Sequence, residues 1–263
     1  KLIADAASQK PFPAAVLTFI ENNILSQVLP LLQDEDFIVD QTLRILSVAS
    51  EEKPEILKIL AKQNIITYIF NSIGDNQAAQ KLATQLISSN EVSIDCLVNT
   101  RFVPAVIGSL DKKENLENAI ELLYVTLSMI EKKKNKRNLN KSFHSLATMA
   151  PKMASLILDY TKAGNCLCLL TKIFTPQGNQ NDVVIESAFN PLATSLSAGY
   201  QKQEYATILS EVIKTLQWSA ENSPATRLKI KGSKSLMLIL RKAADNGTDE
   251  VKQAANSCIK AIK

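Results

Sequence analysis

The stretch KPEILKILAKQNIITYIFNSIGD, residues 53–75, decides the fold because it holds two amphipathic helix patterns joined by a polar corner. Apolar residues recur at helical spacing in residues 56–60 and again in residues 65–73. The polar pair Gln63 and Asn64 separates the two runs. The stretch therefore predicts a short helix, a tight corner and a second helix.

The rest of the chain repeats this joint. The spacings between successive corners run from 37 to 50 residues and average about 42, a period typical of solenoid repeats with two or three helices. The corners are expected near residues 23, 64, 101, 151, 190 and 232. Each joint is followed by a longer apolar helix, expected at residues 37–50, 77–88, 116–130, 166–174, 204–220 and 248–262.

A unit of three short helices cannot bury its apolar faces alone, so its stability must come from the units beside it. Five residues after each corner the side chain is apolar in five of six units, namely Val28, Ile69, Val106, Leu156 and Met237, with Ser195 as the exception. We therefore expect an all-α fold, a right-handed superhelix of about six repeats in one domain spanning residues 1–263. The approximate repeats are residues 12–52, 53–90, 91–131, 142–181, 182–222 and 223–263, with a basic linker at 131–141.

Composition agrees with a helical scaffold. Only 7 of the 263 residues are glycine, which is few for the turns of an all-β protein or for a phosphate-binding loop. The net charge is +4, and residues 131–141 alone carry +5, so the remainder is nearly neutral. This distribution argues against a surface devoted to nucleic acid.

The basic linker contains a patch made of Lys132, Lys133, Lys134, Lys136 and Arg137. Such a run is most often a solvated loop, but it also suits an acidic partner or a nuclear targeting signal. Because no aromatic residues interleave with these cations, we do not expect binding to single-stranded nucleic acid.

The short helix, corner, middle helix and long helix together resemble an armadillo repeat. The segments IITYIFNSIGDNQAAQKLATQLISS and FVPAVIGSLDKKENLENAIELLYVTL are similar to its middle and last helices, and the resemblance covers nearly the whole chain. HEAT repeats are the close alternative. The resemblance implies a protein-binding scaffold. Of the asparagine positions that many armadillo proteins use to hold peptides, only Asn256 matches, and Trp218 is the only tryptophan.

We expect the last helices of successive units to line a concave face that binds a peptide or a protein domain. The side chains predicted to face this groove are Arg44, Ser47, Gln85, Ser88, Tyr124, Ser128, Lys214 and Gln217. We expect no enzymatic activity, cofactor or metal, because His144 is the only histidine and no second ligand pattern accompanies it.

Two other functions remain open. The chain begins with Lys1, which suits a regulatory or scaffold part of a larger kinase, cytoskeletal or ciliary protein. A HEAT-type chaperone cofactor or tubulin-binding module would instead bind through its edge loops, including Lys112 and Lys113. Four cysteines without redox or zinc spacing and the lack of a membrane-spanning run point to the cytoplasm, with the nucleus as the alternative.

Overall fold

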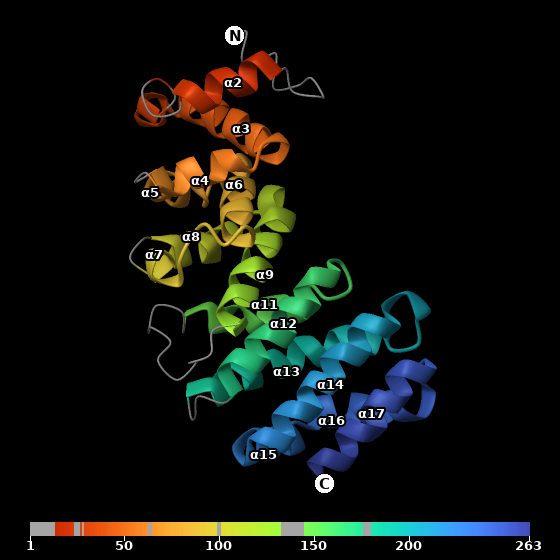
Figure 1. The fold of residues 1–263 in the computed structure, drawn as a ribbon. Helices are drawn as coiled ribbons and strands as arrows, with labels where there is room; N and C mark the ends of the chain where they lie inside the picture. The colour runs from red at the N-terminus through yellow and green to blue at the C-terminus, as the bar shows by residue number, and fades with distance from the viewer. Residues whose placement is uncertain are drawn as a thin grey trace. The chain divides into compact units, whose positions relative to one another are not determined.

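The computed structural model describes residues 14–23, 27, 29–62, 65–98, 101–132, 145–175 and 180–263, and every regular element in these ranges is a helix (Figure 1). The all-α prediction is confirmed. The chain divides into two compact units, unit 1 at residues 1–126 and unit 2 at residues 127–263. The handedness of a superhelix, the number of repeats and the single-domain organisation remain predictions.

In unit 1, short helical elements come in pairs, and each pair is followed by a longer helix. Its core includes Phe70 and Phe102, both fully buried, whose ring centroids lie 4.7 Å apart. The elements in order are α2 (Ala14–Asn23), η2 (Leu29–Gln33), α3 (Asp36–Glu52), α4 (Glu55–Lys62), α5 (Ile65–Ser72), α6 (Gln77–Ser88), α7 (Ile94–Val98), α8 (Phe102–Ser109), η3 (Lys113–Asn115) and the start of α9 (Leu116–Lys132). In this unit α3 packs on α6 and α5 packs on α8, so equivalent helices of successive joints contact each other.

Local sequence explains why α6 begins and ends where it does. The Asn76 side chain caps its start by accepting a hydrogen bond from the Ala79 N–H at 3.0 Å. After Ser89, Asn90 takes a left-handed conformation with a φ of 58°. The N–H groups of Asn90 and Glu91 then donate to the carbonyls of Ile87 and Leu86, which closes the helix with a Schellman motif.

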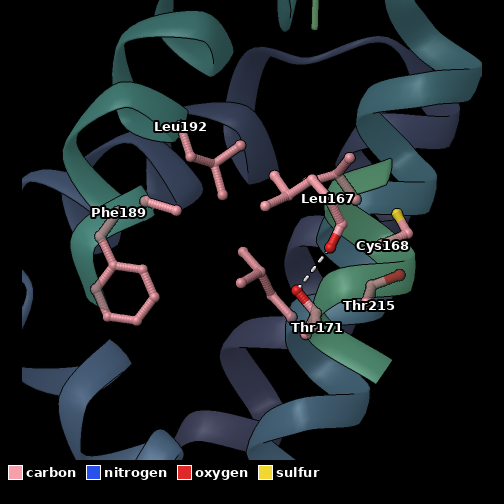
Figure 2. Close-up of a pocket in the computed structure, with 9 residues that line it drawn as sticks. Leu167, Cys168, Thr171, Phe189, Leu192 and Thr215 are labelled. Atoms are coloured by element: carbon pink, nitrogen blue, oxygen red, sulfur yellow. Dashed lines mark hydrogen bonds between the residues drawn. The ribbon is translucent and has the colours of Figure 1, made fainter. Parts of the chain in front are cut away.

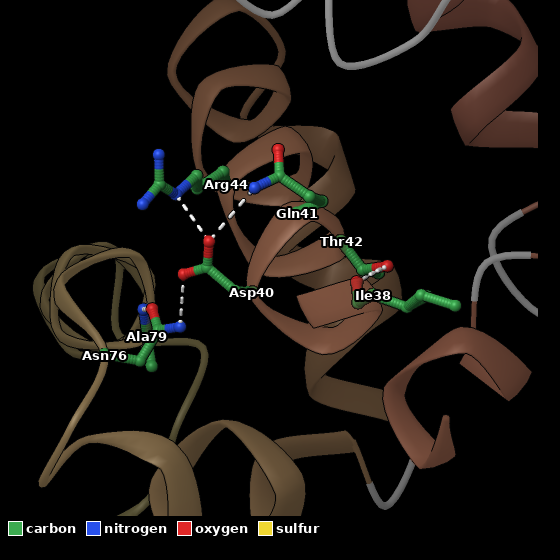
Figure 3. Close-up of polar contacts among 7 residues, drawn as sticks. All are labelled: Ile38, Asp40, Gln41, Thr42, Arg44, Asn76 and Ala79. Carbon is green, nitrogen blue, oxygen red and sulfur yellow. Dashed lines mark hydrogen bonds and ion pairs between the residues drawn. The ribbon is translucent and has the colours of Figure 1, made fainter. Parts of the chain in front are cut away.

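A polar cluster joins α6 to α3 in unit 1. Asp40 on α3 accepts hydrogen bonds from the Asn76 Nδ2 at 2.7 Å and from the Gln41 Nε2 at 3.1 Å, and it pairs with the Arg44 Nε at 2.9 Å (Figure 3). Asn76 therefore caps one helix and anchors that helix to its neighbour. This double role fixes the register between two successive long helices.

Unit 2 arranges its helices in two layers. Its elements are the end of α9, then η5 (Ser145–Met149), α11 (Ala150–Ser155), α12 (Thr161–Phe174), α13 (Gln180–Gly199), η7 (Gln203–Tyr205), α14 (Ala206–Asn222), α15 (Pro224–Gly232), α16 (Lys234–Asn246) and α17 (Asp249–Ile262). In one layer α13 packs on both α11 and α16, and in the other α14 packs on both α12 and α17 (Figure 1). The long helices α13 and α14 thus each pack against the equivalent helices before and after them in the chain.

The corner expected at Asn190 is wrong, because α13 runs without a break through Asn190 and Pro191. A proline inside a helix removes one hydrogen bond and costs about 3 kcal/mol. Phe189, Leu192 and Leu196 are buried at helical spacing on both sides of it, and such burial contributes roughly 1.5–3 kcal/mol per large side chain. The corner at Gly232 is confirmed, since α15 ends there and α16 begins at Lys234. The corner at residue 101 is also confirmed, since Arg101 directly precedes the start of α8 at Phe102. The corner at Asn64 lies outside the described residues.

Two glycines, one at a close contact between helices and one in open space, give a pair of opposite predictions for the free energy of unfolding. In α12, a Cβ on Gly164 would lie 2.5 Å from the Cγ1 of the buried Ile208 on α14. In α8, a Cβ on Gly108 would meet nothing within 4 Å. We expect Gly164→Ala to lower the free energy of unfolding by about 1–3 kcal/mol through overpacking. Gly108→Ala should raise it by about 0.5–1 kcal/mol because alanine favours helix.

Urea unfolding followed by circular dichroism measures both glycine variants against the unsubstituted chain. We expect the free energy of unfolding to fall for Gly164→Ala, where α12 packs closely on α14, and to rise for Gly108→Ala. Changes of the same sign in the two variants would contradict this prediction.

Candidate functional site

A polar cleft runs between α14 and α17, neighbouring long helices of unit 2. Its volume is about 300 Å3. The residues that line it are Lys214, Gln217, Glu250, Gln253, Ala254 and Ser257. Two of these, Lys214 and Gln217, belong to the groove predicted from the sequence. We call this feature the α14–α17 cleft.

The sequence places these side chains by helical periodicity. On α17, Val251, Ala254, Ala255, Cys258 and Ile262 are buried, and Glu250, Gln253 and Ser257 follow the edge of that apolar stripe. Glu250, Gln253 and Ser257 were not predicted from the sequence. Their spacing of three and four residues beside the apolar stripe is the signal that identifies them.

The polar groups of the cleft are already ordered. The Lys214 Nζ donates to the Glu211 Oε1 at 2.9 Å, and the Gln217 Nε2 donates to the Glu221 Oε1 at 2.8 Å. At one end of the cleft the Thr207 Oγ1 donates to the Glu250 Oε2 at 3.5 Å. The cleft therefore offers one cation, one anion, two amides and a hydroxyl.

This mixture suits the main chain of a polypeptide. A glutamine amide has both a donor and an acceptor, the pair of groups that each peptide unit also presents. A small-molecule site is mostly apolar and encloses its ligand, whereas Ala254 is the only apolar side chain among the residues lining this cleft. Within the described residues no group of three or more His, Cys, Asp or Glu side chains is placed to hold a metal ion.

Asn256 does not line the cleft. Its Nδ2 donates to the Ala244 carbonyl of α16 at 3.4 Å and to the Lys252 carbonyl at 3.0 Å. The asparagine that matches the armadillo pattern thus faces the other layer of unit 2. Gln253, one turn earlier in α17, is the amide that lines the cleft.

In unit 1 the predicted groove residues differ in their exposure. Arg44 and Ser88 are exposed, and Arg44 pairs with Asp40. Ser47 is only 3% exposed, so its side chain is not presented to a partner. The Gln85 Nε2 donates to the Ser47 carbonyl at 3.2 Å, and Gln85 therefore links α6 to α3.

The remaining predicted residues lie on or near α9. Tyr124 and Ser128 are half-buried, and Lys132 is exposed at the end of that helix. The other members of the basic patch, Lys133, Lys134, Lys136 and Arg137, lie outside the described residues, as does His144. Trp218 on α14 is half-buried.

A second cavity lies inside unit 2, between α12, α13 and α14. Figure 2 shows Phe189 and Leu192 on one side, with Leu167, Cys168 and Thr171 facing them. Its volume is about 10 Å3, which is room for about one water molecule. It is a packing gap in the core and is too small for a substrate.

The four cysteines are free thiols with raised pKa values. Burial raises the pKa of Cys258 to about 12, and it also raises the pKa of Cys166, which is fully buried. A protonated, buried thiol is a poor nucleophile. Cys166 and Cys258 are therefore core residues.

We expect Cys166 and Cys258 to resist a thiol reagent in the folded chain near neutral pH, and the half-buried Cys96 to react first. The free energy of unfolding should also fall as the pH rises from 9.0 towards about 12, because the unfolded Cys258 loses its proton while the folded one keeps it. Mass spectrometry of labelled chains and urea unfolding in alkaline buffers test this. Rapid labelling of Cys258 under native conditions would contradict it.

The chain matches no known family model and no curated protein. Within the described residues, no helix combines the length and apolar character required to cross a membrane.

Proposed function

We propose that the protein is a non-enzymatic interaction module and that the α14–α17 cleft binds an extended polypeptide segment of a partner protein. The observation that carries the proposal is the pairing of Lys214 and Gln217 on α14 with Gln253 and Glu250 on α17 along one polar cleft. The armadillo resemblance points to the same face of the last helices.

The mechanism follows from the groups that the cleft presents. The amides of Gln217 and Gln253 can exchange hydrogen bonds with peptide N–H and C=O groups, which gives affinity that depends little on sequence. Lys214 and Glu250 add selectivity for side chains of opposite charge. Because the two helices are packed together before binding, the cleft loses little conformational entropy when it binds.

The binding of edge loops, the HEAT-type alternative, has less support. Lys112 already forms an ion pair with Asp75 in unit 1. This pair lies on the surface, as does the pair of Lys214 with Glu211, so neither excludes binding. We favour the cleft because it brings polar side chains of two packed helices together along one surface.

A displayed library of random peptides, selected against the whole chain, tests the proposal. The selected peptides should lose about tenfold in affinity for Lys214→Glu and for Gln253→Glu, a loss of about 1.4 kcal/mol. The matched controls are Lys260→Glu and Gln203→Glu, since both side chains are exposed and neither lines the cleft. Equal affinity for cleft variants and controls would exclude the cleft.

A further inference from the structure

The exposed large apolar side chains of the described residues fall into two groups, one in each unit. Leu31, Phe37 and Tyr68 belong to unit 1, and Leu228 and Leu238 belong to unit 2. Phe37 is 73% exposed, Leu228 is 68% exposed and Leu238 is 58% exposed. Apolar side chains this exposed mark an interaction surface where complementary groups accompany them, and the charges around each group supply that second observation.

The unit 1 group is surrounded by negative charge. Residues 29–40 contain four acidic residues and no basic one, and Asp34, Glu35 and Asp36 lie exposed directly before Phe37. Tyr68 joins this group because its hydroxyl accepts a hydrogen bond from the Gln33 Nε2 at 2.9 Å. We call residues 31–37 with Tyr68 the acidic apolar patch.

The unit 2 group is surrounded by positive charge. Residues 224–246 contain six basic residues and one acidic residue, a net charge of +5 that equals that of residues 131–141. Lys234, Leu238, Arg241 and Lys242 share one exposed face of α16 at spacings of three and four. We call this face, together with Leu228 and Lys231 of α15, the basic apolar patch.

Some basic side chains of this region already have an interaction partner, and others have no ion-pair partner. Lys229 pairs with Glu186 at 3.0 Å, and the Arg227 Nε donates to the Ala220 carbonyl at 3.0 Å. Lys234, Arg241 and Lys242 have no ion-pair partner within the described part of the chain.

The two leucines of the basic apolar patch lie close to each other along the chain. Each is five residues from the corner at Ser233, which at 1.5 Å per residue is about 7.5 Å of helix. The cations Lys231 and Lys234 lie between them in the sequence.

We propose that the acidic apolar patch of one molecule binds the basic apolar patch of a second copy of this chain. Each patch supplies what the other lacks, since apolar side chains meet apolar side chains and carboxylates meet free cations. Because the two patches are different surfaces, the contact is heterologous and adds molecules head to tail.

A membrane is the poorer fit for the basic apolar patch. A helix that binds at a lipid interface turns a broad apolar face with several large side chains outward. Here the apolar faces of α15 and α16, including Ile230, Leu236 and Leu240, are buried in unit 2. A single exposed leucine on each helix remains.

Sedimentation velocity of the whole chain over a range of concentrations tests the proposal. We expect weak association that grows with concentration and falls with added salt, because screening weakens contacts between exposed charges. The first variant is Glu35→Lys with Asp36→Lys, which leaves Asp34 in place because its Oδ1 accepts the Glu35 N–H. The second variant is Arg241→Glu with Lys242→Glu.

Neither variant should associate alone. The first reverses the charge of the exposed run before Phe37, and the second leaves the four charged positions of the basic apolar patch with no net charge. An equal mixture should associate, since each variant keeps the patch that the other has lost. The matched control is Lys58→Glu with Lys81→Glu, two exposed lysines outside both patches, which should associate like the unsubstituted chain. Circular dichroism checks that each variant is folded.

Three results would overturn the proposal. The unsubstituted chain could stay monomeric, either double variant could still associate alone, or the equal mixture of the two variants could stay monomeric. Binding to vesicles of phosphatidylcholine and phosphatidylserine is the alternative outcome. If the chain bound these vesicles without self-association, and only Arg241→Glu with Lys242→Glu lost the binding, the basic apolar patch would be a membrane-binding surface. That result would also overturn the proposal.

Discussion

Replacing Phe70 by alanine should lower the free energy of unfolding by about 3–5 kcal/mol, the range for removing a fully buried aromatic side chain. Phe70 on α5 is 0% exposed and lies 4.7 Å, centroid to centroid, from Phe102 on α8. The substitution thus opens a cavity at the contact between two successive joints of unit 1. Chemical unfolding followed by circular dichroism gives the difference.

The control is Phe37→Ala, which removes the same side chain at a position that is 73% exposed. It should change stability by less than about 0.5 kcal/mol when measured in dilute protein. If both variants lost the same stability, the α5–α8 contact would not be a principal source of stability in unit 1.

Replacing Asn76 by alanine should cost about 2–4 kcal/mol. The change removes a helix cap, worth about 1 kcal/mol, and a hydrogen bond to a carboxylate, worth about 1.5–3 kcal/mol. The two contacts are the Ala79 N–H to the Asn76 Oδ1 at 3.0 Å and the Asn76 Nδ2 to the Asp40 Oδ1 at 2.7 Å (Figure 3). Thermal unfolding of the variant and of the unsubstituted chain provides the comparison.

The neighbouring residue provides the control for Asn76. The Asp75 side chain is 82% exposed and its ion pair with Lys112 lies on the surface. Asp75→Ala should therefore cost less than about 1 kcal/mol. A double-mutant cycle of Asn76→Ala with Asp40→Ala separates the cap from the contact between helices, and additive losses would show that the two side chains are not coupled.

The sequence predicted the long helices well because their boundaries depend on local chemistry. Residues 77–88 were expected and α6 spans Gln77–Ser88, since Asn76 and Asn90 define both ends. The helix expected at residues 166–174 begins earlier, at Thr161. Its first turn contains Gly164, which looks unfavourable for a helix but lets α14 approach closely.

Packing between helices determines features of the fold that local sequence patterns do not predict, such as the unbroken course of α13. Asn190 and Pro191 resemble a corner, but burial on both sides holds α13 in one piece. The Asn190 Oδ1 also accepts a hydrogen bond from the Ser235 hydroxyl of α16 at 2.8 Å, a contact between residues 45 positions apart. No short window of sequence contains that information.

The candidate site was predicted in part for the same reason. Lys214 and Gln217 follow from the polar face of a single helix. The opposite side of the cleft required knowing which residues of α17 face α14, and the armadillo pattern pointed to Asn256 instead of Gln253. Ser47 was predicted to face the groove but is buried, because a small polar residue is easily buried where two long helices pack.

The most direct test of the proposed function is photo-crosslinking from the cleft. A photoreactive phenylalanine analogue at position 253 should crosslink to a selected peptide, and unlabelled peptide should compete. The same analogue at position 203, which is exposed and outside the cleft, should give no crosslink. A peptide that binds the chain but crosslinks only from position 203, or equally from both positions, would contradict polypeptide binding in the α14–α17 cleft.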